Sequence, residues 1–177
     1  MKSTKKYKWL GGIFFMVVVI LLVLHQYGYR YNATPSYPVG FYKVNTADNQ
    51  IRRGKLVLVC PPDTKAFKEA NKKSYIHKGF CPSGYQPLIK KIAGVPGDRI
   101  IVDRFVYING IKQPKSRVYD VDPQGYKLAH TPKKEYHLGS NQIFLLSDYN
   151  DKSFDSRYFG PVNTNLIQGA ITPVKVW

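Results

Sequence analysis

The sequence predicts a mainly β protein: an antiparallel, partly closed β-domain carried on a single N-terminal transmembrane helix. Residues 9–24 form an uncharged and almost wholly apolar run, which predicts the helix. Beyond residue 30, short runs rich in β-branched residues alternate with turns containing Gly and Pro, and no long amphipathic helix interrupts them. A length of 177 residues suits one such domain together with its anchor.

The apolar run reaches the length of a membrane span when its flanks are included. A span needs about 20 residues, and residues 9–27 supply them, with aromatic residues at both ends. The four lysines of residues 1–8 predict a basic tail on the cytoplasmic side, so that residues 28–177 form an extracytoplasmic domain. A cleaved signal peptide is the alternative, but no small-x-small cleavage pattern follows the run, which favours an uncleaved anchor.

The charge balance points to an anionic partner. Lys and Arg outnumber Asp and Glu by 27 to 11, which gives a formal net charge of +16. Such an excess suits a nucleic acid, an anionic membrane surface or an acidic protein. The lysines are scattered, many of them over residues 65–78, and no nucleic-acid-binding motif surrounds them. With a membrane span next to the domain, the lipid bilayer is the expected partner, and direct binding of nucleic acid is not expected.

The β-domain is expected to begin with the strand Lys55–Cys60, which Pro61 and Pro62 stop. Pro96 and Gly97 suit the two central positions of a type II turn, and the pair Asn109-Gly110 predicts a hairpin. Residues 112–140 are expected to be irregular. The remaining predicted strands are Leu88–Ala93, Arg99–Asp103, Phe105–Ile108, Gln142–Leu146 and Ala170–Trp177.

Two cysteines, Cys60 and Cys81, are the whole cysteine content of the chain. In an exported domain such a pair predicts one disulfide, which would tie back the polar, basic excursion at residues 63–86 and contribute about 3 kcal/mol. Two buried free thiols are the alternative. The four histidines form no metal-ligand spacing, so neither a metal nor a cofactor is expected.

The first candidate for chemistry is Ser36, which stands between Pro35 and Pro38. Both prolines restrict the backbone around the serine, and Gly40 permits a turn after it. A held hydroxyl beside its own free N–H is what acyl transfer needs. A plain linker next to the membrane is the alternative. Ser36 follows the apolar run by 12 residues, so it lies within about 40 Å of the bilayer.

A serine near neutral pH needs a base within hydrogen-bond reach. No histidine has a persuasive setting, and a lysine must be neutral, although at its ordinary pKa of about 10.4 only about one in two thousand is neutral at pH 7. Burial lowers the pKa of a lysine, so the candidates are Lys90 and Lys91, which lie inside an apolar strand. Their side chains point to opposite faces, and the pattern does not say which is buried. Two ordinary strand lysines are the alternative.

The third candidate is the polar and aromatic segment 147–161, directly after the predicted strand that ends at Leu146. Asp151, Asp155 and Arg157 crowd this strand end. They form either a surface turn with ion pairs or the polar wall of a site.

Together the three segments resemble the type I signal peptidases, which are membrane serine proteases with a Ser/Lys dyad. The string Ser36-Tyr37-Pro38 resembles the nucleophile box of that family, and residues 90–98 resemble its lysine box, in which the base lies four residues before the first glycine and is therefore Lys90. Residues 148–160 resemble the last box. The resemblance runs from about residue 34 to residue 161.

The chain departs from the usual family pattern in the first and last boxes. Tyr37 stands where the family usually has Met. The last box of the family usually opens with Gly-Asp-Asn, whereas this chain has Ser147-Asp148-Tyr149. The single anchor, the short length and the cysteine pair are more similar to the conjugative-transfer branch, the TraF peptidases. These process the pilin precursor of a DNA-transfer apparatus, and some of them join its ends into a ring.

The resemblance implies a mechanism and a location. Lys90 would take the proton of Ser36, which would form an acyl-enzyme on a pilin-type or signal-peptide-bearing precursor. The Ser36 N–H and the Thr34 hydroxyl would hold the oxyanion, and no cofactor is needed. The protein would span the inner membrane once, with its catalytic domain in the periplasm. Supporting roles fall on Ser153, which would aim Lys90, and on an ion pair of Asp155 with Arg157.

Two further hypotheses remain open at this point. The chain could be a general type I signal peptidase. It could instead be a non-catalytic, membrane-tethered scaffold of a secretion complex, for which Ser36 would be dispensable.

Overall fold

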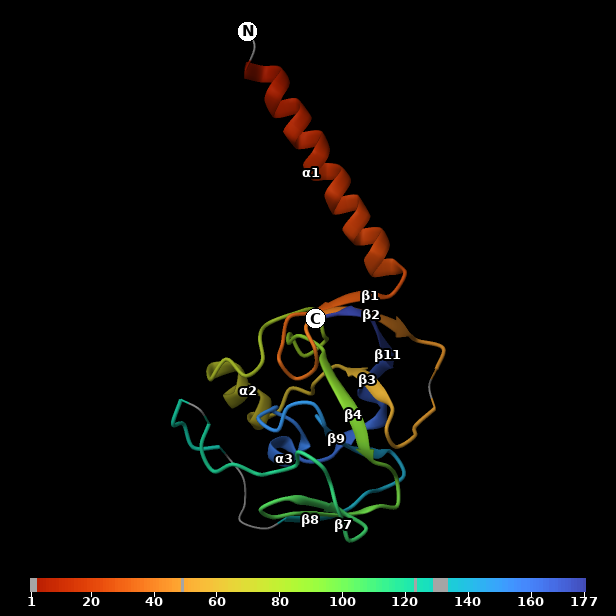
Figure 1. Cartoon of the computed structure of the whole chain (residues 1–177), viewed down its shortest axis with the longest axis vertical. Helices are drawn as coiled ribbons and strands as arrows, with labels where there is room; N and C mark the ends of the chain where they lie inside the picture. The colour runs from red at the N-terminus through yellow and green to blue at the C-terminus, as the bar shows by residue number, and fades with distance from the viewer. Residues whose placement is uncertain (1–2, 49, 123, 129–133) are drawn as a thin grey trace.

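A long N-terminal helix projects from one end of a β-domain in the computed structural model (Figure 1). The structure describes residues 3–48, 50–122, 124–128 and 134–177. The helix α1 (Ser3–Gln26) includes a stretch, Trp9–Gln26, that is long and apolar enough to cross a membrane, by length and composition, and none of this stretch is buried against the domain. Residues 1–2 of the predicted tail lie outside the described residues, and the rest of the tail continues the helical backbone.

The larger of two sheets has seven strands in the order β1-β2-β11-β3-β4-β9-β10, and all of its neighbouring strands are antiparallel. Strand β2 pairs with β11, from the far end of the chain. The strands are β1 (Tyr29–Asn32), β2 (Gly40–Asn45), β3 (Leu56–Val59), β4 (Leu88–Gly94), β9 (Gln142–Leu146), β10 (Val162–Asn163) and β11 (Ile167–Val176).

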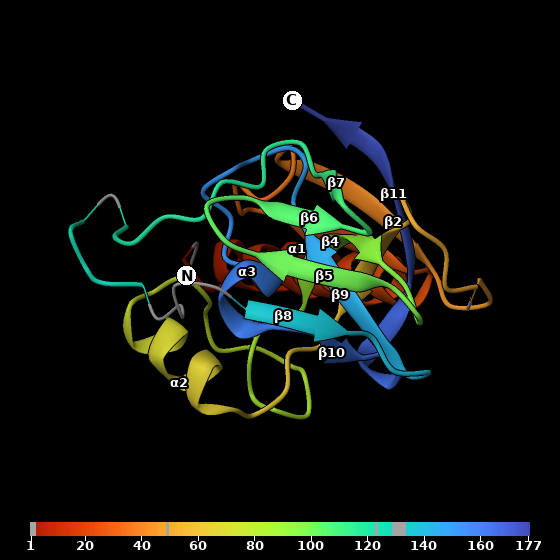
Figure 2. The same cartoon turned by 90° about the horizontal axis from the view of Figure 1, so that it is seen from below.

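The smaller sheet has four antiparallel strands in the order β7-β6-β5-β8 and lies at the end of the domain away from α1 (Figures 1 and 2). Its strands are β5 (Arg99–Val102), β6 (Val106–Ile108), β7 (Ile111–Lys112) and β8 (Lys134–His137). Seen from below, it crosses β4 and β9 of the larger sheet. The prediction of a mainly antiparallel β-domain after one apolar helix is therefore confirmed.

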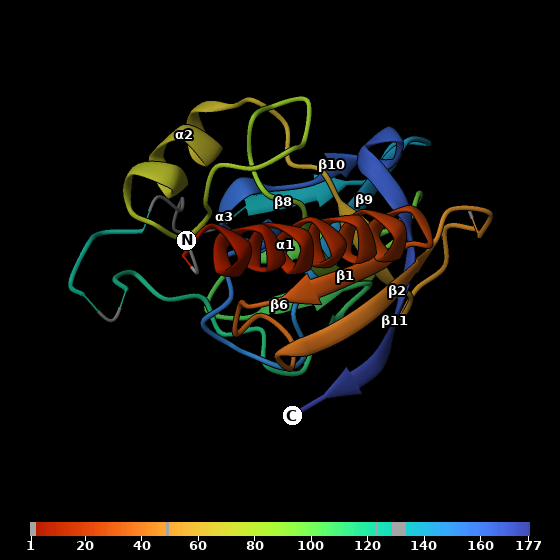
Figure 3. The same ribbon diagram turned by 90° about the horizontal axis from the view of Figure 1, so that it is seen from above.

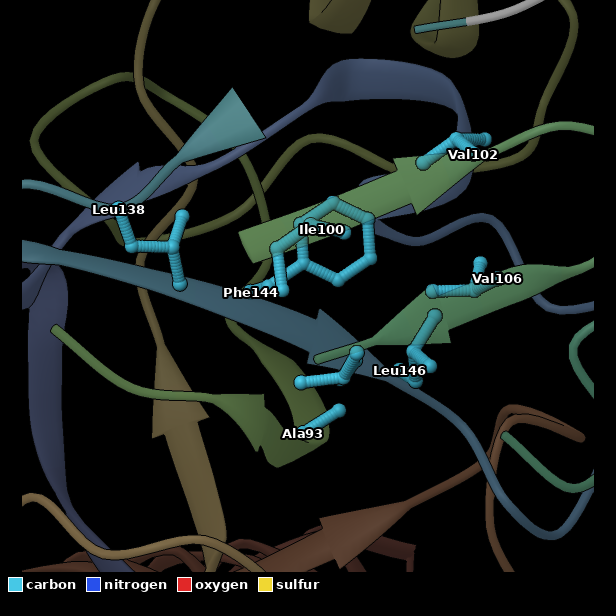
Figure 4. Packing of buried hydrophobic residues seen from close by; sticks show 8 residues of the cluster. Ala93, Ile100, Val102, Val106, Leu138, Phe144 and Leu146 are labelled. Carbon is cyan, nitrogen blue, oxygen red and sulfur yellow. The ribbon is translucent and has the colours of Figure 1, made fainter. Parts of the chain in front are cut away.

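The apolar core between the two sheets follows from the alternation of side chains along their strands. Phe144 of β9 is fully buried and points toward Ile100 of β5 (Figure 4). Each fully buried aliphatic or phenyl side chain of this kind contributes about 1.5–3 kcal/mol relative to an exposed one. The other buried members of the cluster are Ala93, Val102, Val106, Ile108, Leu138 and Leu146.

Both predicted turns are present. Gly97 has a φ of 86°, and the Asp98 N–H donates to the Val95 carbonyl at 3.1 Å, which closes the turn after β4. Asn109 and Gly110 have φ values of 50° and 82° and join β6 to β7. Positive φ at both positions is the backbone that a tight hairpin needs and that an Asn-Gly pair tolerates.

Strands β1, β2, β7, β8 and β10 have no counterpart among the predicted strands. In β2 the side chains alternate, with Tyr42 and Val44 buried and Phe41 and Lys43 exposed, which is an ordinary strand pattern. Strand β8 lies within residues 112–140, and the prediction that all of this region is irregular is wrong. It is an edge strand with a half-exposed, polar sequence, so little apolar alternation marks it.

The basic excursion at residues 63–86 contains a helix, α2 (Lys65–Lys72), that was not expected. Phe67 and Ala70, three positions apart, lie on one face of this helix and are buried against Ile76 and Tyr85. The excursion thus has a small core of its own. It also packs on α3 (Ser156–Phe159), because the Phe67 and Phe159 rings lie 4.8 Å apart between centroids.

Candidate active site

Ser36 lies in the loop between β1 and β2, and a buried amide shapes this loop. The Asn32 Nδ2 donates to the carbonyls of Thr34, Tyr37 and Pro38 at 3.0–3.1 Å. The Tyr42 hydroxyl also donates to the Pro38 carbonyl, at 2.7 Å. Sequence reasoning missed Asn32. Its signal is an amide at a strand end, where an Asn side chain often satisfies backbone groups of the next turn.

Lys90 lies in the middle of β4, opposite Val57 of β3, and is 1% exposed. Its neighbour Lys91 faces the other side of the sheet, where its amine forms an ion pair with the half-buried Asp148. The alternation of a strand thus separates a buried amine from a solvated one. This decides the question that the sequence pattern left open.

The structure brings Ser36, Lys90 and Ser153 together, although they come from three distant parts of the chain. The Lys90 Nζ lies 2.9 Å from the Ser36 Oγ and 2.8 Å from the Ser153 Oγ. The two hydroxyl oxygens are 3.1 Å apart. These distances allow a proton to pass from serine to lysine without rearrangement.

Burial lowers the pKa of Lys90 to about 8, while the Asp155 carboxylate acts in the opposite direction and Arg157 adds to the lowering. An amine in apolar surroundings loses its hydration and therefore disfavours its charged form. With this pKa about one tenth of the Lys90 amines are neutral at pH 7, against about one in two thousand for an ordinary lysine. The amine can therefore accept a proton near neutral pH.

Asp155 and Arg157 form a doubly hydrogen-bonded ion pair, and both side chains are completely buried. The guanidinium also donates to the carbonyls of Ser153, at 2.9 Å, and of Arg117, at 2.7 Å. Because the planar guanidinium holds several acceptors in fixed directions, the pair orients the backbone that carries the Ser153 hydroxyl. The pair is thus structural support for the Lys90 environment.

The two predicted oxyanion donors, the Ser36 N–H and the Thr34 hydroxyl, differ in whether they already donate to another protein group. Within the described part of the chain, the Ser36 N–H donates to no protein acceptor. The Thr34 hydroxyl instead donates to the Asn32 Oδ1 at 2.8 Å. Its proton becomes available to an oxyanion only if the exposed Thr34 side chain rotates.

A cavity of about 640 Å³ opens beside these residues. The excursion contributes Tyr75 and His77 to its walls, and the segment 119–128 contributes Tyr119 and Asp122. The Tyr75 hydroxyl donates to the Asp122 carboxylate, so the two walls are joined. Of the third predicted segment, the cavity is lined by Asn150, Lys152, Ser153, Phe154 and Tyr158. Sequence reasoning did not find Tyr75 or Asp122, because only the fold brings their loops to the dyad.

Cys60 and Cys81 are joined in a disulfide. Cys60 directly follows β3, so the bond ties the excursion to the larger sheet. Among the described residues, no group of three His, Cys, Asp or Glu side chains is placed to hold a metal ion.

The geometry defines a class of protein, namely an antiparallel β-domain that holds a serine hydroxyl against a buried lysine amine, as acyl transfer by a Ser/Lys pair requires. The family model described as "Signal peptidase, peptidase S26" matches residues 5–177. The chain belongs to this signal peptidase family, and its relatives place it in the TraF branch. The resemblance drawn from the sequence motifs is confirmed.

Among these relatives, a plasmid transfer protein TraF from Escherichia coli is 39% identical over 85% of this chain and 84% of that protein. A conjugal transfer protein TraF from Agrobacterium tumefaciens (strain 15955) is 37% identical over 83% of this chain and 82% of that protein. Signal peptidase I of Bacillus caldolyticus is 32% identical over 52% of this chain and 55% of that protein. The crystal structure of a signal peptidase I from Enterococcus faecalis V583 aligns with 70% of this chain and 97% of that chain, with a TM-score of 0.40. The two sequences are 21% identical.

Proposed function

We propose that this chain is a membrane-anchored serine endopeptidase that uses a Ser36/Lys90 dyad to cleave signal-peptide-bearing or propilin-type precursors at the membrane surface. The observation that carries the proposal is the 2.9 Å contact between the Ser36 Oγ and a lysine amine that is 1% exposed. A charged, solvated amine at this position could not act as a base, whereas a buried one can.

The reaction proceeds through an acyl-enzyme. Neutral Lys90 takes the proton of Ser36 as the serine oxygen attacks the scissile carbonyl carbon. The oxyanion accepts a hydrogen bond from the Ser36 N–H. It accepts a second one from the Thr34 hydroxyl after the Thr34 side chain has rotated. One such donor is worth about 3–4 kcal/mol in the transition state. The protonated Lys90 then gives its proton to the leaving amine, and the peptide bond breaks.

Release of the acyl group repeats these steps with a second nucleophile. Neutral Lys90 takes a proton from water as the water oxygen attacks the ester carbonyl carbon. The bond from the acyl carbon to the Ser36 oxygen then breaks, Lys90 returns the proton to the Ser36 Oγ, and the new carboxylate is released. If a peptide amine attacks in place of water, a new peptide bond forms and the precursor is joined into a ring. That outcome requires an amine held near the ester while water is kept away.

Residues around the dyad support it by orienting its groups. The Ser153 hydroxyl, 2.8 Å from the Lys90 amine, aims that amine at Ser36. The buried Asp155–Arg157 pair holds the Ser153 backbone. Both are positioning groups in this mechanism.

The location that fits this function is the inner membrane. Residues 1–8 form the cytoplasmic tail, residues 9–27 the anchor, and residues 28–177 the periplasmic peptidase domain. An uncovered apolar helix supports this arrangement. So does a cluster of exposed aromatic rings: Tyr31 on β1, Phe41 on β2 and Trp177 directly after β11. Strands β1 and β2 lie next to α1 (Figure 3). Aromatic rings favour the membrane–water interface.

The proposed substrate is the pilin precursor of a conjugative DNA-transfer apparatus, because the relatives matched over most of their length are plasmid and conjugal transfer proteins. A general signal peptidase is the second candidate, supported by the match to the Bacillus protein. A non-catalytic scaffold would need the anchor and the basic charge, but it has no use for a hydroxyl and a buried amine in contact.

The proposal is tested with the full-length protein in vesicles containing a candidate pilin precursor. Ser36→Ala and Lys90→Met are each expected to abolish cleavage, because each removes one half of the dyad. Ser140→Ala, an exposed serine away from these contacts, is the control and is expected to cleave normally. Normal cleavage by Ser36→Ala would favour the scaffold. Mass spectrometry of the product separates hydrolysis from ring closure, since the ring is one water lighter than the cut chain.

A further inference from the structure

Four consecutive residues, 147–150, hold three consecutive residues, 35–37, around the nucleophile. The Ser147 Oγ donates to the Ser36 carbonyl at 2.6 Å. The Tyr37 hydroxyl donates to the Asp148 Oδ1 at 2.8 Å, and the Asn150 Nδ2 donates to the Pro35 carbonyl at 3.1 Å. We call residues 147–150 the nucleophile clamp. Each of residues 35–37 thus has its own hydrogen bond to the clamp.

Ser147 is the best-held member of the clamp. It is 1% exposed, and its hydroxyl oxygen accepts from the N–H groups of Asn150, at 3.0 Å, and Tyr149, at 3.3 Å. With these two acceptor positions filled, the single hydroxyl proton points to the Ser36 carbonyl. The Ser147 N–H donates to the Asp155 Oδ2 at 3.1 Å. The clamp is therefore continuous with the buried ion pair that also holds Ser153.

Tyr37 connects the same segments through its ring. It is 7% exposed and lies nearly parallel to the Tyr149 ring, with 6.2 Å between centroids and 20° between planes. Burial and the Asp148 carboxylate both raise the pKa of the Tyr37 phenol, so it stays protonated and remains a donor. The Asp148 carboxylate also accepts from the Lys91 amine. The negative charge opposite Tyr37 is therefore balanced.

The loop at Ser36 needs such support because it belongs to no strand. Residues 33–39 make no ladder pairs, and the strand pairing of β1 with β2 ends at Asn32 and Gly40. A hydrogen bond to the Ser36 carbonyl restricts rotation of the peptide that follows the serine. The direction of the Ser36 hydroxyl toward Lys90, and of its N–H toward an oxyanion, depends on this backbone. A misplacement of about 1 Å can cost about 100-fold in rate.

We propose that Ser147 is a positioning residue for the nucleophile: its hydroxyl holds the Ser36 backbone so that the Ser36 Oγ stays within reach of Lys90. Tyr37 and Asn150 make the same contribution on either side of Ser36. The proposal rests on the proposed function, since it concerns the turnover of the same dyad.

The test is steady-state cleavage of one precursor by Ser147→Ala. Loss of the hydroxyl is expected to lower kcat about 10- to 100-fold with little change in KM, because the substrate cavity keeps its walls while the nucleophile is misplaced. Tyr37→Phe keeps the ring but loses the bond to Asp148, and it is expected to lower kcat several-fold. When combined with Ser147→Ala, its effect is expected to be less than additive, since both substitutions release the same segment.

Ser116→Ala is the matched control. Ser116 is also 1% exposed, donates to a carbonyl, that of Gln113, at 2.7 Å, and accepts from a backbone N–H, that of Val106, at 3.2 Å. Its loss should cost similar stability, but it touches neither the dyad nor the clamp, so kcat should stay within about twofold. If Ser147→Ala lowers the thermal midpoint no more than Ser116→Ala does, the loss of kcat is not a loss of folded protein.

The outcomes separate the two proposals. Ser147→Ala with the kcat of the unsubstituted protein, while Ser36→Ala is inactive, overturns the role of Ser147 and leaves the dyad intact. Full cleavage by Ser36→Ala overturns both. If Ser147→Ala does not fold, the double variant Tyr37→Phe with Asn150→Ala carries the test, since it removes the other two hydrogen bonds that hold the same segment. Unchanged kcat in that variant would then reject the clamp.

Discussion

Lys90 carries a titratable amine that is almost completely buried, and this single side chain should set how cleavage depends on pH. With its pKa at about 8, the neutral base becomes more abundant as pH rises. We therefore expect kcat/KM to rise about tenfold per pH unit below pH 7 and to level off above about pH 8. Cleavage measured from pH 5.5 to pH 10 on one soluble peptide checks this profile.

The control for this profile is Lys90→Arg, which keeps a positive charge but stays protonated over the whole range. It is expected to be inactive at every pH, since it offers no neutral base. A profile that still rises up to pH 10, as an ordinary lysine with a pKa of about 10.4 would give, would mean that the amine is solvated during turnover and would contradict the proposed mechanism.

The excursion at residues 63–86 is the element with the most direct effect on the cavity. It supplies Tyr75 and His77 to the walls, and the Cys60–Cys81 disulfide closes its loop over a sequence separation of 21 residues. A double Cys60→Ala and Cys81→Ala substitution is expected to lower the free energy of unfolding by about 3 kcal/mol, because the unfolded chain regains the freedom of that loop. It should also raise KM more than it lowers kcat. Urea denaturation and steady-state kinetics measure the two effects.

Reduction of the unsubstituted protein by dithiothreitol serves as the comparison, since it breaks the same bond without changing other atoms of the side chains. The reduced protein and the double variant should agree in stability and in KM. Equal stability of the oxidised and reduced proteins would show that the excursion is held by its own small core around Phe67 and not by the disulfide.

At the scale of the whole molecule, the anchor and the domain are expected to be separable. The Trp9–Gln26 stretch of α1 buries none of its residues in the domain, so removing residues 1–27 should leave the free energy of unfolding within about 0.5 kcal/mol of the full chain. Cleavage of a soluble peptide should be unchanged. Cleavage of a precursor inserted in vesicles should fall at least about tenfold, because tethering raises the local concentration of enzyme at the membrane.

The vesicle experiment needs a variant that keeps the anchor but lacks activity, and Ser36→Ala in the full chain supplies it. Equal cleavage of the inserted precursor by the full and truncated chains would mean that the anchor does not serve to bring enzyme and substrate together. An unfolded truncated chain would contradict the independence of the domain instead.

The sequence by itself determined the local features of this protein. A long apolar run predicts α1 whatever follows it, and Asn109-Gly110 predicts its hairpin, because both signals depend only on neighbouring residues. The order of three short motifs was enough to single out Ser36 and Lys90. The strands with continuous apolar runs were also predicted, whereas β8, a polar edge strand, was not.

The tertiary structure alone decided which residues meet. A period-two pattern says that Lys90 and Lys91 face opposite ways, but only the packing of β4 between β3 and β9 decides which face is buried. The contact of Ser147 with Ser36 spans 111 positions. The hydrogen bond of Tyr75 with Asp122, which joins two walls of the cavity, spans 47 positions. Such contacts depend on the path of the whole chain, because the free energy of burying the core, and not any local preference, brings distant segments together.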